Sequence, residues 1–168
     1  MIPEIKRILY ATDLSKNSSF AFFYAVDMAR QHNARIVILH SIEPGRHMVW
    51  SRIEEMMVRA KKQEQEMGLE EIKKRLQEFC KRIEAQFGFP CVDLVSKILV
   101  PLGHPLEEIL KAADEEGCDM IVLGSHGKGF LTQTFLGSVA GSVLERSRKP
   151  VFVIPLPPEK TDIDWDKI

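Results

Sequence analysis

A glycine-rich segment in the last third of the chain contains the residues best suited to bind an anion. Gly124-Ser125-His126-Gly127 directly follows an apolar run, and Gly137-Ser138 opens the next helical pattern. Glycines let backbone N–H groups approach a ligand closely because no Cβ stands in the way. A helix start adds unpaired N–H groups and a partial positive charge, and Ser138 adds a hydroxyl donor. The spacing predicts a phosphate cradle, and the alternative is a surface loop with ordinary turn glycines.

These glycines do not fit three other phosphate or nucleophile motifs. A Walker A loop needs G-x-x-x-x-G-K-[ST], but here Lys128 is followed by Gly129. A Rossmann fingerprint follows the first strand of its fold, whereas these glycines follow the fourth predicted strand. The run Gly124-Ser125-His126-Gly127 also does not match the G-x-S-x-G elbow of α/β hydrolases.

Each titratable side chain near a predicted strand end or turn could bind a ligand or could have a structural role instead. Asp13 follows the first predicted strand, where its carboxylate could face a ligand or close an Asx turn, and we favour the ligand. His126 and Lys128 lie in the glycine loop: we expect an exposed, non-catalytic His126, while Lys128 could pair with phosphate or face water. We expect His40 in the core and His104 in a turn.

No spacing in the sequence predicts a protein-bound metal or a catalytic pair. The 5 histidines are scattered, and the 3 cysteines form no C-x-x-C motif. We find no carboxylate pair or positioned general base, so we expect no catalytic residue, and any hydrolysis of a bound ligand should be slow.

Five apolar runs alternate with helical patterns and would position the glycine segment. The expected strands are 5–11, 36–42, 92–100, 120–123 and 151–154, and the expected helices are 20–32, 50–87, 106–116 and 137–148. Gly68 divides the second helical region into two helices or one kinked helix. This alternation predicts an α/β fold with a doubly wound parallel sheet and helices on both faces. Ligands of such sheets bind outside the carboxyl ends of the strands.

Composition and charge exclude several classes of protein. A chain of 168 residues corresponds to about one domain. With 45% hydrophobic residues and a net charge of −1, it is neither disordered nor a typical nucleic-acid binder. It has no apolar run long enough to span a bilayer and no secretory signal pattern, so we expect a cytoplasmic protein without membrane or nucleic-acid partners.

The glycine segment and several short motifs resemble the universal stress proteins. Gly124-x2-Gly127-x9-Gly137-Ser138 matches the G-x2-G-x9-G-[ST] nucleotide signature of that family. Residues 8–13, 39–41, 103–105, 119–124 and 149–151 agree in order and spacing. The resemblance covers essentially residues 4–154.

The resemblance implies a five-stranded sheet in the order 3-2-1-4-5, of the adenine nucleotide alpha hydrolase-like type. It implies binding of ATP, or of AMP or ADP, with Mg²⁺ or Mn²⁺ held through the phosphates. By position, the implied binding residues are Ala11, Thr12, Asp13, Ser41, Leu123, Gly124, His126, Gly127, Gly137, Ser138 and Val139. Two of them depart from the family pattern, because position 11 is often Pro and position 41 is commonly a β-branched apolar residue.

We expect a single domain over 1–168, with a core at 4–154, a helical insertion at about 46–87 and a tail at 155–168. An apolar edge strand at 151–154 would aggregate if left bare. The family's usual solution is antiparallel pairing with a second subunit, so we expect a homodimer through Val151, Phe152, Val153 and Ile154. The alternative is that the tail, with Ile163 and Trp165, covers this edge.

The leading hypothesis is an ATP-binding stress-response regulator with slow or no hydrolysis. One alternative is a dimeric interaction module that uses region 50–87, where Met56 and Met57 suit adaptable apolar contacts with an unknown protein partner. Another is a nucleotide hydrolase or nucleotidyl transferase, but it would require a positioned base that we do not find. At most we expect a weak ATPase.

Overall fold

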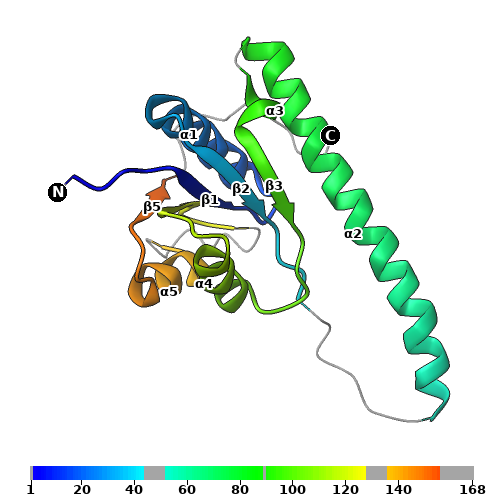
Figure 1. Cartoon of the computed structure of the whole chain (residues 1–168). Helices are drawn as coiled ribbons and strands as arrows, with labels where there is room; N and C mark the ends of the chain where they lie inside the picture. Colours follow the sequence, from blue (N-terminus) through cyan, green and yellow to red (C-terminus); the bar gives the residue numbers. More distant parts are fainter. Residues whose placement is uncertain (1, 44–51, 89, 128–135, 156–168) are drawn as a thin grey trace.

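The computed structural model describes residues 2–43, 52–88, 90–127 and 136–155, with the backbone alone at Lys16 and over 52–69. The strands of the sheet are β1 (Arg7–Ala11), β2 (Arg35–Leu39), β3 (Val95–Leu99), β4 (Met120–Gly124) and β5 (Val151–Ile154). They are parallel, in the order β3-β2-β1-β4-β5 (Figure 1). The expected doubly wound sheet and its strand order are confirmed.

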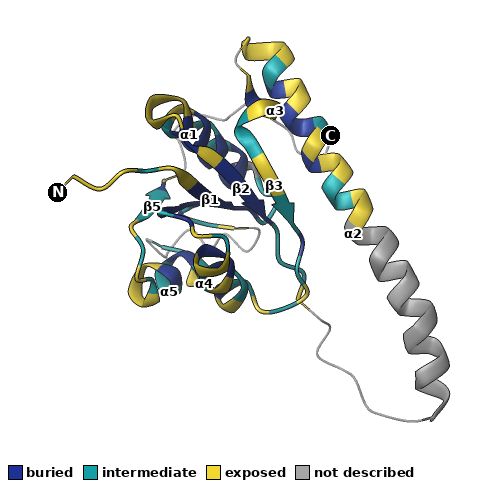
Figure 2. Cartoon of the chain, in the orientation of Figure 1, coloured by how far each residue is buried: buried dark blue, intermediate teal, exposed yellow. Residues whose placement is uncertain are grey.

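Helices cover both faces of this sheet. They are α1 (Lys16–His32), α2 (Arg52–Phe87), α3 (Cys91–Leu94), α4 (Pro105–Glu115) and α5 (Ser138–Arg146). Side chains alternate along each strand, so Ile8 and Tyr10 pack with α1 and the second half of α2. Leu9 and Ala11 point to the other face and pack with α4 and α5. Figure 2 shows the central strands buried between these two layers.

The second helix, α2, runs from Arg52 to Phe87 and passes Gly68 without a break. Of the two arrangements expected from the sequence, two separate helices are therefore wrong and a single helix is observed. Its second half carries the stripe expected from the sequence. Leu76, Phe79 and Ile83 are buried against the sheet. Among the described residues, no helix has an apolar stretch that could cross a bilayer.

The third strand begins later in the structure than the sequence predicts. Residues 92–94 belong to the short helix α3, and only Val95–Leu99 pairs with β2. The N–H of Val92 donates to Glu84 Oε2 at 3.0 Å, and Cys91 is fully buried between α2 and the sheet. These contacts with α2 hold a helical turn where the apolar, β-branched sequence alone indicated a strand.

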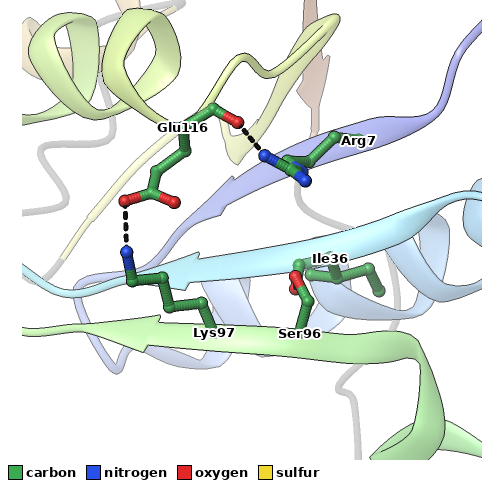
Figure 3. A network of polar contacts seen from close by, with 5 residues as sticks. All are labelled: Arg7, Ile36, Ser96, Lys97 and Glu116. Atoms are coloured by element: carbon green, nitrogen blue, oxygen red, sulfur yellow. Dashed lines mark hydrogen bonds and ion pairs between the residues drawn. The ribbon is translucent and has the colours of Figure 1, made fainter.

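The edge strand β3 is tied to its neighbours by polar side chains (Figure 3). Lys97 Nζ lies 2.6 Å from Glu116 Oε1, and the Ser96 hydroxyl donates to the Ile36 carbonyl at 3.1 Å. Arg7 donates to the Glu116 carbonyl from β1. The pairing of β3 with β2 also shifts register beside Ile36. A short strand with a lysine and an irregular register resists pairing with further strands.

Candidate functional site

A cavity of about 580 Å³ opens at the carboxyl ends of the strands, where α1 and α5 begin. All eleven residues expected to bind a ligand line it: Ala11, Thr12, Asp13, Ser41, Leu123, Gly124, His126, Gly127, Gly137, Ser138 and Val139. The fold thus brings together strand ends that are far apart in sequence. Lys128, which the sequence placed in the same loop, lies outside the described residues. The binding role of these residues remains a prediction.

The wall that follows β1 is a tightly bonded turn. The amide of Leu14, which has a left-handed φ of 63°, donates to Thr12 Oγ1 at 3.0 Å, and that hydroxyl donates to Ser18 Oγ at 2.9 Å. Asp13 Oδ1 accepts the N–H of Ser15 at 3.0 Å, while Ser15 caps α1. Asp13 therefore forms the Asx turn that was the structural alternative, and it also lines the cavity; its contact with a ligand stays a prediction.

The opposite wall is the base of the glycine loop. The N–H of Ser125 donates to Ile154 at the end of β5, at 2.7 Å. The carbonyl of Ser125 accepts the N–H of Gly137 at 2.7 Å, so the two ends of the loop meet. The Ser125 hydroxyl also lies 2.8 Å from His126 Nδ1. These bonds fix Ser125 and His126 by the backbone and by the side chains.

The glycines of the signature sit where a larger residue fits only if a neighbouring group moves. A Cβ at Gly127 would collide with Asp13 Oδ2, and a Cβ at Gly137 would lie 3.0 Å from the Ser125 carbonyl oxygen. Close approach of backbone to neighbouring groups is the usual reason for glycine at such positions. The spacing of the sequence motif thus reflects packing as well as access for a ligand.

Asn17 is a site residue that sequence reasoning missed. It is 4% exposed, and its Nδ2 donates to the carbonyl of His126 at 2.8 Å. Nδ2 also lies 2.8 Å from the position of a Cβ at Gly124. Among the described residues, its Oδ1 is buried without a hydrogen-bond partner. The contact joins the first turn of α1 to a loop in the other half of the chain, and no local sequence signal could have indicated it.

The end of β2 contributes backbone and apolar surface to the cavity. The Ser41 hydroxyl donates to the Gly103 carbonyl at 2.7 Å, so this serine, which departs from the family pattern, bonds to the turn that precedes α4. His40 is half-buried, and its Nδ1 donates to the Thr12 carbonyl at 2.8 Å. Further apolar lining residues that the sequence motif did not include are Leu39, Pro105, Ile109, Leu136 and Ala140.

The electrostatics of the cavity favour an anion beside an apolar group. The helix α5 starts at Ser138 with Gly137 as its N-cap and no side chain capping it. Its first N–H groups therefore point toward the cavity end without intrahelical partners. No group of three or more metal-ligating side chains occurs in the described ranges.

Comparisons with known proteins agree with this architecture. The model of the universal stress protein family matches residues 4–155. Universal stress protein MJ0577 of Methanocaldococcus jannaschii is 32% identical over 154 residues, which cover 89% of this chain and 94% of that protein. The universal stress protein in the QAH/OAS sulfhydrylase 3′ region of Thermus aquaticus is 32% identical over 153 residues, 89% of this chain and 98% of that one.

Solved structures share the fold over nearly the whole chain. The structure of MJ0577 has a TM-score of 0.69 at 32% identity and covers 94% of this chain and 100% of its own. A universal stress protein in complex with cAMP has a TM-score of 0.60 at 23% identity and covers 91% of this chain and 98% of its own. With the family model matching most of its length and two relatives at 32% identity, the chain belongs to the universal stress protein family.

Proposed function

We propose that this protein is a cytoplasmic regulator that binds an adenine nucleotide, with ATP as the main ligand, in the cavity at the carboxyl ends of the strands. The observation that carries the proposal is the convergence of an apolar pocket with the glycine loop and the uncapped start of α5. A nucleotide has the matching parts, since its base is flat and largely apolar and its phosphates are anionic.

In this arrangement, Ala11, Thr12 and Asp13 would border the adenine and ribose, and the backbone at Ser41 would meet the adenine edge. The ribose and the first phosphate would lie along Leu123, Gly124 and Gly127. The outer phosphates would be held by Gly137, Ser138 and Val139 at the start of α5, where backbone N–H groups need no basic side chain. A divalent cation would be bound through those phosphates.

The described side chains of the cavity favour storage of the nucleotide over its hydrolysis. Asp13 and His126 are the titratable groups among the described lining residues. The amide of Ser15 holds one oxygen of Asp13, and the Ser125 hydroxyl lies against His126 Nδ1. A general base has to reach the attacking water, and both groups are already engaged in holding the turn and the loop. We therefore expect hydrolysis to be slow or absent.

The comparisons support the class of ligand. A universal stress protein with the same fold has been crystallised with cAMP, which is also an adenine nucleotide. The 3 cysteines of this chain are all free thiols, which fits a reducing cytoplasm.

The experiment that tests the proposal starts from purified protein. After denaturation, the released small molecules are identified by mass spectrometry, and the melting temperature of the native protein is measured with and without Mg-ATP. We expect released adenine nucleotide and a higher Tm with Mg-ATP, because a ligand that binds only the folded state stabilises it. The absence of both would overturn the assignment.

We also propose a homodimer formed by antiparallel pairing of β5 with its copy. The two edges of the sheet support this assignment because they differ. The edge at β3 carries Lys97 and an irregular register, whereas β5 has regular pairing with β4 and no charged residue. Phe152 on β5 is 42% exposed. An apolar, regular edge strand tends to pair with another strand, and a second copy offers a matching one.

A further inference from the structure

Two aromatic side chains, Phe20 and Tyr24, form an aromatic face on the outer side of α1. The sheet side of this helix is centred on Phe22, which is fully buried. Phe20 and Tyr24 are two positions before and after Phe22, so each lies about 200° around the helix, on the outer side. Tyr24 is 42% exposed and Phe20 is half-buried. Outward positions of a surface helix are normally polar.

The rings of this face are organised rather than scattered. Phe20 and Tyr24 pack edge to face with centroids 5.4 Å apart. Phe23 makes a similar contact with Phe87 at the end of α2, at 5.3 Å. Tyr24 and Phe87 are the exposed members of these two pairs, at 42% and 44%.

The chain continues from β5 close to this face. Strands β1 and β5 are parallel, so the end of β5 at Ile154 lies at the same sheet edge as the start of α1. The Ile154 side chain packs in the same cluster as Phe22, and Phe20 packs against that cluster. Pro155 therefore follows β5 at the edge of the sheet where α1 begins.

The sequence of that segment has one apolar side. In Asp162-Ile163-Asp164-Trp165-Asp166, acidic and apolar residues alternate strictly. In an extended chain, alternate residues point to opposite sides, so Ile163 and Trp165 share one side and the three aspartates share the other. Trp165 is ten residues beyond Pro155, a reach of up to about 33 Å, whereas α1 is about 25 Å long.

We propose that residues 156–168 of this chain dock on the aromatic face of α1 as an extended segment, with Ile163 and Trp165 against Phe20 and Tyr24 and the aspartates toward water. The covered face explains both the outward aromatic residues of the helix and the alternating pattern of the tail. Removal of the tail uncovers an apolar surface of the protein that a partner can then reach.

Tryptophan fluorescence tests the proposal directly, because the chain has 2 tryptophans and Trp50→Phe leaves Trp165 alone. In this parent variant, we expect emission at shorter wavelength than in urea and weak quenching by acrylamide. In the Phe20→Ser/Tyr24→Ser variant, the emission should shift to longer wavelength and quenching should approach that of the unfolded chain. Leu144→Ser is the matched control, because Leu144 is 52% exposed on α5, on the other face of the sheet. It should change neither signal.

Three outcomes would overturn the proposal. The first is full quenching of Trp165 in the parent. The second is protection of Trp165 from acrylamide that survives the change at Phe20 and Tyr24 but is lost with Phe152→Ser. That result assigns the tail to the β5 edge. The third is protection that is lost on dilution, which assigns the contact to a second copy. Ile163→Ser is the second variant. It leaves α1 intact and should also expose Trp165, so the test holds even where the helix variant fails to fold.

Discussion

The N–H of Gly137 donates a 2.7 Å hydrogen bond to the carbonyl oxygen of Ser125. This bond joins the start of α5 to the residue after β4, and the N–H of Ser125 in turn bonds to the end of β5. The two ends of the glycine loop are therefore joined by backbone bonds, and the Asn17 side chain adds a bond to the His126 carbonyl. A ligand held by N–H groups at the start of α5 depends on this closure, because the bond sets how far α5 stands from the strand ends.

Gly137→Ala should weaken nucleotide binding by about tenfold, or about 1.4 kcal/mol. Its Cβ would lie 3.0 Å from the Ser125 oxygen and 3.3 Å from the His126 Cα, so the start of α5 has to move outward. Isothermal titration with Mg-ATP measures the change. Gly141→Ala is the matched control, because its Cβ meets Leu136 at an ordinary 3.6 Å. That change should keep the affinity and raise the free energy of unfolding by about 0.5–1 kcal/mol.

Gly127→Ala should also lower nucleotide affinity, but here the new Cβ meets the side chain of Asp13, which can rotate away from it. Its Cβ would collide with Asp13 Oδ2, while Asp13 Oδ1 holds the N–H of Ser15. The two sites should therefore be coupled: Asp13→Ala should cost less affinity in the Gly127→Ala background than in the parent. Binding measured over this double-mutant cycle decides the point, and strictly additive losses would contradict the contact.

The sequence predicts the parts of this site that lie next to each other along the chain. The apolar runs predict strands because strands covered on both faces bury every residue, and each strand end is then followed by its loop residues, such as Asp13 and Gly124. The helical turn at 91–94 was not predictable, because contacts with α2 outweigh a local preference for strand. The contact of Asn17 with His126 was not predictable either, since it exists only after β1 and β4 pair.

A negative charge at position 17 should lower the free energy of unfolding more than truncation of the Asn17 side chain does. Asn17→Ala removes the donor to the His126 carbonyl and should cost about 1–2 kcal/mol in the free energy of unfolding. Asn17→Asp keeps the shape but replaces the Nδ2 donor by an ionised oxygen that faces a carbonyl, so it should cost more. Urea unfolding at neutral pH measures both. A smaller loss for Asn17→Asp than for Asn17→Ala would show that the donor does not matter.

Stability should fall in mild alkali because of a buried thiol. Burial raises the pKa of Cys118 from 9.0 to about 11, so above about pH 9 the unfolded chain loses this proton first. The stabilisation from the neutral, buried thiol is fully present below pH 9. As pH rises toward 11 it is lost, and the free energy of unfolding falls by about 1.4 kcal/mol per pH unit. Burial also raises the pKa of Tyr10, which adds to the loss at higher pH.

The variant Cys118→Ala should flatten this alkaline slope in urea unfolding measured at several pH values. Val143→Ala is its control, since Val143 is buried in the same cluster and does not titrate. That change should lower stability equally at each pH. Equal slopes in the parent and in Cys118→Ala would contradict the role of the thiol.

The two edges of the sheet should respond differently to charge. Phe152 is 42% exposed on β5, and Phe152→Lys places a charge in the middle of the strand expected to pair with its copy. Lysine on an edge strand opposes strand pairing, so light scattering at micromolar concentration should change from the mass of two chains to that of one. Lys97→Val at the β3 edge is the matched control, because it removes the charge that protects the opposite side. It should leave the β5 dimer intact. A parent protein with the mass of one chain, or loss of the dimer in Lys97→Val alone, would remove β5 as the interface.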